Sequence, residues 1–165
     1  CVYVGRACDC SSNNVTQENV FGDSLGGKGN NTTFLGGTNG VYNEANQSSF
    51  QTTSDIRIKK NVIDNTSGLD KINQIRVRNF EYRTPDEIDY TEFAEGTNPK
   101  SIPINMEGVQ LGVIAQEIEE VLPEVVKTQS TGVKTVDPDN LTWYLVNAVK
   151  ELSAEVEQLK SQLNN

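Results

Sequence analysis

The C-terminal part of the chain carries a seven-residue repeat of aliphatic side chains, which strongly restricts how it can fold. The repeat has two aliphatic positions, a (Val149, Val156, Leu163) and d (Leu145, Leu152, Leu159). Glu155 at position g precedes Lys160 at position e by five residues, so the two charges attract each other across neighbouring parallel helices. The pattern predicts a helix over about 140–164 that joins a parallel coiled coil, in preference to one buried within a single chain. Valine at a with leucine at d favours a coiled coil of two helices, but these positions alone do not decide between a dimer and a trimer.

The composition agrees with a chain that assembles. Hydrophobic residues make up 35% of its 165 residues, a low share for a domain that buries its own core, so we expect neighbouring copies to complete it. The net charge of −9 opposes binding to nucleic acid, because phosphate contacts need a basic surface. No apolar run reaches the roughly 20 residues of a membrane span. We expect a soluble protein, without membrane insertion, whose partners are proteins.

The stretch Thr53–Asn61 separates two kinds of sequence. Before it, Gly, Asn, Ser and Thr dominate, whereas after it come a helical amphipath, apolar strand segments and the heptads. We therefore predict two domains, a β-rich segment over 1–53 and a mixed segment over 54–165 that contains helices and strands. The predicted fold class is α+β.

The segment 1–53 contains three imperfect copies of a short motif, which consists of an apolar residue, glycine, any residue and a small residue. The copies are Val4-Gly5-Arg6-Ala7, Phe21-Gly22-Asp23-Ser24 and Leu35-Gly36-Gly37-Thr38. Such a short period predicts stacked short strands in a trimeric β-roll or β-prism, because one turn cannot bury its apolar face alone. The alternative is a linker rich in Gly and Asn.

Alternation and helical spacing predict the elements of 54–165. We expect strands over 56–62, 75–83 and 109–114, a hairpin formed by 125–127 and 133–136, a helix of about ten residues capped by Ser67 and Asp70, and a helix over 115–122 that ends at Pro123. Asn140 or Asp139 is the expected N-cap of the terminal helix. The acidic stretch 85–107 is expected to be a solvated loop, with a lid as the functional alternative.

The cysteines do not indicate a metal site. Cys1, Cys8 and Cys10 are three in number, and an odd number does not close into disulfides within one chain. Too few thiols are present for a zinc site, and the chain has no histidine. We expect no metal and no cofactor. The absence of histidine also excludes Ser-His-Asp and Cys-His machinery within this chain, which leaves lysine or a carboxylate as the base.

A serine and a lysine stand at the start of the second segment. Ser54 precedes Lys59 by five residues, with Asp55 and Arg57 between them. These are the residue types needed for a serine nucleophile whose base is a lysine. The alternative is a polar strand start without chemistry.

A wider set of segments, in a fixed order, extends this pattern to the C-terminus. The segments are Ser54-Asp55-x-Arg57-x-Lys59, Gly112–Ile118, Leu122–Val126, Val136-Asp137 and the terminal amphipathic helix. Together they resemble the intramolecular chaperone auto-processing domain of phage tail fibres and tailspikes, which is peptidase family S74.

The resemblance implies an activity and a place in the virion. It implies a domain that trimerises through its coiled coil, folds the β-rich trimeric stalk ahead of it, and then cuts itself off between Thr53 and Ser54. It places the nucleophile at Ser54 and its partner at Lys59. The chain would be a homotrimer whose own N-terminal fibre is both folding client and substrate. It would belong to a virion tail fibre or tailspike precursor that assembles in the host cytoplasm and releases the chaperone domain if cleaved.

Several residues are candidates for supporting the cut. Asp55 is either a structural partner of Arg57 or an orienting group for Lys59, and Gly112 is expected to let a backbone pass closely. Gln116 and Glu117 either begin a helix or, as the resemblance implies, support the cleavage site.

Cleavage by a Ser-Lys pair needs a neutral amine, which a free lysine with a pKa of about 10.4 seldom provides at pH 7. We expect trimer contacts or the neighbouring cations Arg57 and Lys60 to favour the neutral amine of Lys59. If trimer contacts do so, cleavage occurs only after folding is complete. Two alternatives do not need the cut. The domain would then be a trimerisation tip retained on the fibre, or a receptor-binding adhesin tip.

Overall fold

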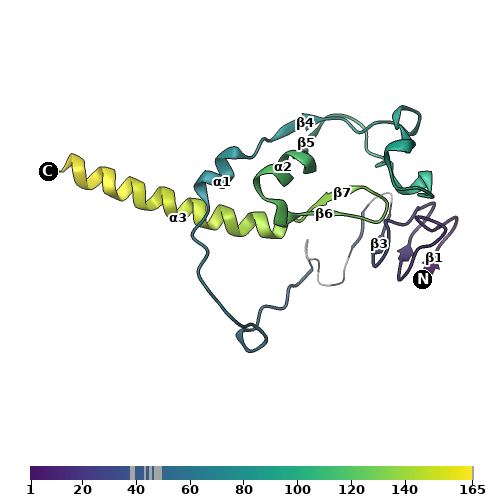
Figure 1. Cartoon of the computed structure of the whole chain (residues 1–165), viewed down its shortest axis with the longest axis horizontal. Coiled ribbons are helices and arrows are strands. Elements are labelled where there is room, and N and C mark those ends of the chain that lie inside the picture. Colours follow the sequence, from purple (N-terminus) through teal and green to yellow (C-terminus); the bar gives the residue numbers. More distant parts are fainter. Residues whose placement is uncertain (38–39, 43, 45, 47–49, 165) are drawn as a thin grey trace.

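The computed structural model describes residues 1–37, 40–42, 44, 46 and 50–164. Small β-sheets and α-helices occur together, which is compatible with the predicted α+β class. Figure 1 shows an elongated molecule, with the N-terminal sheet at one end and the helix α3 (Pro138–Leu163) extending to the other.

The N-terminal sheet consists of three short parallel strands, β1 (Val2–Val4), β2 (Asn19–Phe21) and β3 (Thr33–Leu35). Val4 pairs with Phe21 and Phe21 with Leu35, so the apolar residues of the three motif copies stack in register. Val20 in the middle strand is fully buried. The stacked short strands predicted from the repeat are therefore present, although Thr38 lies outside the described residues.

The strands β1 and β2 are followed by the same kind of turn. Gly5 and Gly22 have φ of 128° and 155°, and the small residues Ala7 and Ser24 have left-handed φ of 51° and 56°. A small residue at that position avoids the crowding that a larger side chain meets there. The motif is therefore a turn signature that brings the chain back for the next parallel strand.

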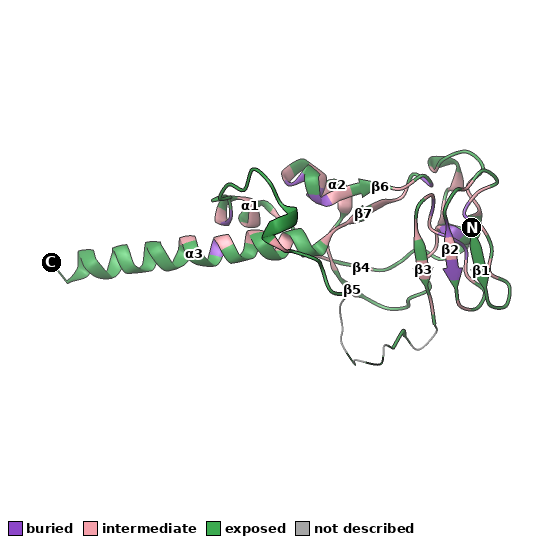
Figure 2. Ribbon diagram, turned by 90° about the horizontal axis from the view of Figure 1, so that it is seen from below, coloured by how far each residue is buried: buried purple, intermediate pink, exposed green. Residues whose placement is uncertain are grey.

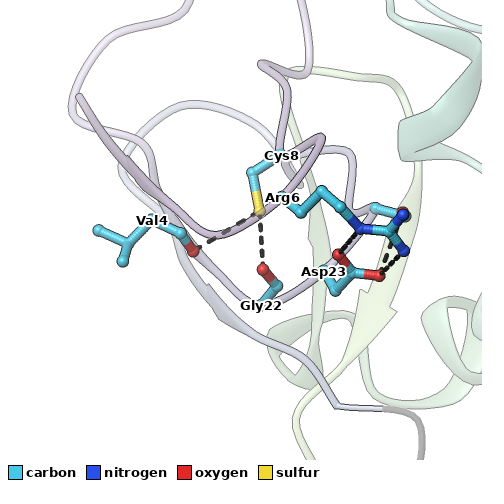
Figure 3. Close-up of polar contacts among 6 residues, drawn as sticks. Val4, Arg6, Cys8, Gly22 and Asp23 are labelled. Atoms are coloured by element: carbon cyan, nitrogen blue, oxygen red, sulfur yellow. Dashed lines mark hydrogen bonds and ion pairs between the residues drawn. The ribbon is translucent and has the colours of Figure 1, made fainter.

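Side chains also connect successive turns of the sheet. Arg6 and Asp23 occupy the same position in their motif copies, and the Arg6 guanidinium donates two hydrogen bonds of 2.8 and 2.9 Å to the Asp23 carboxylate (Figure 3). The Cys8 thiol donates to the carbonyl oxygens of Gly22, at 3.3 Å, and Val4, at 3.7 Å. Cys8 therefore has a structural contact as a free thiol.

The segment 54–165, called the second half below, contains two antiparallel strand pairs and a small core. The strands β4 (Arg78–Phe80) and β5 (Gln110–Gly112) pair, as do β6 (Val126–Thr128) and β7 (Lys134–Val136). The helix α2 (Ala115–Val121) ends before the 3₁₀ turn η5 (Pro123–Val125), as the proline predicts. Ile118, Leu122 and Val125 form the core. The predicted strands near 75–83 and 109–114, and the hairpin after 125, are confirmed.

The helix α1 (Leu69–Gln74) packs closely against α3. A Cβ atom on Gly68 would lie only 2.4 Å from the backbone nitrogen of Ala148, so the absence of a side chain at Gly68 permits the contact. Asn147 donates to the carbonyl oxygens of Asn65 and Ser67 at 2.8 and 3.1 Å. These bonds fix the chain that enters α1 against the terminal helix.

The terminal helix confirms the predicted span but not the predicted cap. Its N-cap is Asp137, whose side chain accepts a hydrogen bond from the backbone of Asp139, and Pro138 takes the first helical position. Proline suits that position because the amide it lacks would be unpaired there, so Asn140 and Asp139 fall inside the helix. The aliphatic a and d residues remain between 45% and 85% exposed in the single chain, and Figure 2 shows α3 exposed along its C-terminal half.

Other predictions of local structure were wrong or incomplete. The segment predicted as a strand over 56–62 contains the 3₁₀ turn η1 (Ile56–Ile58) and has no strand pairing. The helix α1 has six residues, and its N-cap is Gly68 without a side-chain bond, so the Ser67–Asp70 capping box is absent. The region 85–107 contains the 3₁₀ turns η2 (Pro85–Glu87), η3 (Tyr90–Glu92) and η4 (Pro99–Ser101). Its acidic side chains are exposed, as expected of a solvated loop, whereas Ser101 is buried.

No helix among the described residues is long and apolar enough to cross a bilayer.

The core position of Leu122 can be tested by mutation. Leu122 is 1% exposed. The substitution Leu122→Ala should lower the free energy of unfolding by about 2–5 kcal/mol, because the truncation leaves a cavity. Chemical denaturation followed by circular dichroism measures this loss. The control is the same substitution at Leu111, which is 75% exposed. Equal losses in the two variants would contradict the assigned core.

Candidate functional site

The predicted serine and lysine meet in the structure. The Lys59 Nζ atom donates a hydrogen bond of 2.6 Å to the Ser54 Oγ atom. The intervening turn η1 makes this contact possible, because the Lys59 amide bonds the carbonyl oxygen of Ile56 at 3.1 Å and shortens the path between the two side chains. A lysine amine in contact with a serine hydroxyl is the geometry that proton transfer from the hydroxyl requires.

Asp55 holds the turn through Arg57. The Asp55 carboxylate caps η1 by accepting from the Arg57 backbone at 2.8 Å, and it also accepts from the Arg57 guanidinium at 2.6 Å. These hydrogen bonds lower the pKa of the Asp55 carboxyl and raise that of the Arg57 guanidinium. This is the arrangement expected if Asp55 is a structural partner of Arg57.

The pair lies on an exposed segment. Ser54 and Lys59 are both exposed, and the apolar side chains of Ile56 and Ile58 are 66% and 71% exposed. Figure 1 shows the segment that carries η1 projecting away from the hairpins. A single chain therefore brings the Ser54 and Lys59 side chains together but does not exclude water from them.

The predicted supporting residues lie in a different place, at the junction of β5 and α2. Glu117 accepts hydrogen bonds of 2.6 and 3.1 Å from the Arg78 guanidinium, and Gln116 is exposed. A Cβ atom on Gly112 would lie 3.1 Å from the Phe80 ring, so Gly112 admits an aromatic side chain and not the backbone we expected. Among the described residues, no hydrogen bond or ion pair joins Gly112, Gln116 or Glu117 to Ser54 or Lys59.

Two arginines of the 76–78 segment were not singled out in the sequence. Arg78 and, at 3.5 Å, Arg76 both pair with Glu117. The Arg78 hydrogen bonds and the two positive charges lower the pKa of the Glu117 carboxyl. Their spacing, Arg-Val-Arg in a predicted strand, placed both on one face, but nothing in the sequence indicated that α2 covers that face.

A second polar group missed by sequence reasoning lies between η5 and α3. The Tyr144 hydroxyl donates to the Glu124 carboxylate, which raises the pKa of Tyr144 and lowers that of Glu124. Both residues line a hollow together with Asn65, Asn140, Trp143 and Asn147. Because Glu124 belongs to η5 and Tyr144 to α3, this hydrogen bond joins the turn after α2 to the terminal helix.

The cysteines and acidic residues do not assemble into a ligand set. Cys1, Cys8 and Cys10 are free thiols. Within the described part of the chain, no three cysteine, aspartate or glutamate side chains come close enough to hold a metal ion together.

Comparison with known proteins gives the family of the second half. Residues 54–127 match the model of the peptidase S74 family, described as chaperone of endosialidase. This segment is similar to that family. The match begins at Ser54, so the family domain starts at the serine of the Ser-Lys pair, and the resemblance seen in the sequence is confirmed.

Curated relatives include two phage proteins. The long tail fiber protein Gp37 of Enterobacteria phage K3 is 29% identical over 126 residues, which cover 74% of this chain and 9% of that protein. Gp37 of Enterobacteria phage T2 is 29% identical over 126 residues, which cover 74% of this chain and 8% of that protein. The chain thus spans less than a tenth of the length of these relatives.

The Glu117 ion pair predicts a pH dependence of stability. Because its pKa is lowered in the fold, ionised Glu117 adds stability above the usual glutamate pKa of about 4.3 and loses it as the pH falls through the lower, folded value. Glu117→Gln should therefore be less stable than the unsubstituted chain at pH 7, and the difference should vanish in strong acid. Denaturation curves at several pH values measure it. Glu120→Gln, on the same helix, is the control, and a Glu117→Gln deficit that persists unchanged in strong acid would contradict the ion-pair assignment.

Proposed function

We propose that this chain is the C-terminal part of a phage tail fibre or tailspike precursor, in which residues 54–165 act as an intramolecular chaperone. In this function the domain trimerises, folds the fibre ahead of it, and releases itself by hydrolysis between Thr53 and Ser54. The observation that carries the proposal is the 2.6 Å hydrogen bond from Lys59 Nζ to Ser54 Oγ. It lies at the first residue of the matched family domain.

The proposed reaction is a single-turnover cleavage. Ser54 Oγ attacks the carbonyl carbon of Thr53, the new C–O bond replaces the peptide C–N bond, and the chain passes through an ester. Lys59 accepts the hydroxyl proton and returns it to the departing Ser54 amine. Water then hydrolyses the ester, which leaves a carboxylate on Thr53 and frees the Ser54 hydroxyl.

Assembly supplies what the single chain lacks at this site. Neutral lysine is favoured when the amine is removed from water, yet Lys59 and the adjacent apolar side chains are exposed here. The aliphatic stripe of α3 is exposed as well. Packing of neighbouring subunits on both surfaces would place Ser54 and Lys59 in a drier environment only once the trimer is complete, and the cut would then report that folding has finished.

The alternative function is a trimerisation tip that stays on the fibre without being cleaved, and the exposed state of Ser54 and Lys59 is the observation that favours it. A receptor-binding adhesin tip, carried by 1–53, is the third possibility raised by the sequence. No described contact of the N-terminal sheet favours that function over a structural one.

Substitution of the dyad tests the chemistry. Denaturing electrophoresis should show that the purified chain of 165 residues splits into pieces of 53 and 112 residues, the latter being residues 54–165. Ser54→Ala and Lys59→Ala should each abolish the split while the trimer still forms, and Ser54→Cys should retain part of the activity. Lys150→Ala, at an exposed lysine of α3, is the matched control. Full-rate cleavage in Ser54→Ala or Lys59→Ala would exclude the dyad, and an unsplit parent chain would favour the retained tip.

Substitution of the coiled coil tests the dependence on assembly. Leu152→Asp with Val156→Asp places unpaired charges at two successive core positions of every strand, at a cost of several kcal/mol per trimer. The variant should be monomeric by size-exclusion chromatography with light scattering, and its cleavage at Thr53 should stop. Gln158→Asp adds a charge at an exposed position of the same helix and serves as control. A monomeric variant that still cuts at the original rate would refute assembly-gated processing.

A further inference from the structure

Two parts of the second half, the η4 region and the turn between β6 and β7, bind the N-terminal sheet beside its turns. The backbone N–H of Asn98 donates to the Ser11 carbonyl oxygen at 2.6 Å, and the Asn98 side chain donates to the Cys10 carbonyl oxygen at 2.8 Å. Next to this contact, Ser12 and Thr97 form an antiparallel bridge. The turn η4, which Asn98 caps, therefore holds the loop that follows β1.

The next loop of the sheet is held in a similar way. Lys28 Nζ donates to the Ser101 carbonyl oxygen at 2.8 Å, and the Asn30 amide donates to the Ser130 hydroxyl at 2.8 Å. Ser130 lies in the turn between β6 and β7, and Figure 1 shows this hairpin and the 90–101 region reaching the N-terminal sheet. The loops after β1 and after β2 are thus bound by a single surface, the stalk-docking surface, which is formed by Thr97, Asn98, Ser101 and Ser130.

The contact is close, and the part of it around Ser11 and Ser101 is shielded from water. Ser11 is 0% exposed and Ser101 is 3% exposed. A Cβ atom on Gly26 would lie 2.6 Å from the Lys100 carbonyl carbon, and one on Gly29 would lie 2.7 Å from the Ser130 hydroxyl oxygen. The loop after β2 can approach the surface this closely only because these positions are glycine.

The atoms recognised on the N-terminal side are largely those of the backbone. The groups bonded by Asn98 and Ser130 are two carbonyls and an amide, so these two residues recognise the backbone path of the loops. Ser101 binds the one side chain in this set, that of Lys28. The surface therefore suits a correctly stacked pair of turns as its partner.

All N-terminal partners of this surface precede Thr53, and the surface itself follows Ser54. The peptide link between the halves at Gln51–Ser54 is exposed, so cutting it breaks none of these contacts. We propose that the stalk-docking surface keeps residues 1–53 bound to residues 54–165 after the bond between them is hydrolysed, so that release requires this surface to open. The proposal rests on the proposed function for the position of the cut.

The test uses the full chain and a cut that does not depend on Ser54. A recognition sequence for a site-specific protease is inserted between Gln51 and Thr52 of the Ser54→Ala chain, and native size-exclusion chromatography follows the two fragments after digestion. They should co-elute. Asn98→Ala with Ser130→Ala removes two of the hydrogen bonds, so the N-terminal fragment should dissociate about 25 times faster, at roughly fivefold for each bond.

The control is Asp89→Ala. Asp89 caps the neighbouring turn η3 by accepting from the Thr91 amide at 2.9 Å, as Asn98 caps η4, but it lies outside the stalk-docking surface. This variant should retain the fragment like the parent. Separation of the parent fragments on digestion would overturn the proposal, and so would equal retention by the Asn98→Ala, Ser130→Ala variant. Because the added protease makes the cut, a failure of Ser-Lys cleavage leaves this result unaffected.

Discussion

The shortage of apolar burial within one chain is the constraint on which the rest of the structure depends. Among the described residues, the buried apolar side chains are Val20, Ile118, Leu122, Val125 and Ala148. The aliphatic stripe of α3 faces water, with Leu152 and Val156 still 45% and 46% exposed. Burial of apolar surface stabilises by about 25 cal/mol per Å², so the covering of this stripe by other copies would provide stability that the small internal core does not.

The same constraint bears on the chemistry of the site. The turn η1 sets the distance between Lys59 and Ser54 through local hydrogen bonds and the Asp55–Arg57 pair. Geometry at this scale needs only a few adjacent residues. The exclusion of water needs a surrounding surface, and an exposed segment of the chain does not provide one for itself. Positioning of the two side chains and exclusion of water from them are thus separate in this molecule, and the proposed dependence of cleavage on assembly rests on that separation.

The two halves of the chain are joined more extensively in space than in sequence. One exposed stretch of backbone links them, whereas a set of hydrogen bonds connects the N-terminal turns to η4 and to the β6–β7 hairpin. The acidic region before η4 is thus more than a solvated loop, because its last residues form part of this contact. A chaperone that binds backbone at the turns can act on stacked strands whose side chains vary.

The sequence by itself determined the features that depend on local spacing. These are the terminal helix, the in-register turn motifs, the end of α2 at Pro123, and the proximity of Ser54 and Lys59, since each needs only residues close together in the chain. It did not reveal the Arg78–Glu117 pair, the docking of Asn98 on Ser11, or that η1 replaces a strand. The tertiary structure decided these because each depends on which segments meet across long sequence separations, or on the absence of a pairing partner that would have held 56–62 as a strand.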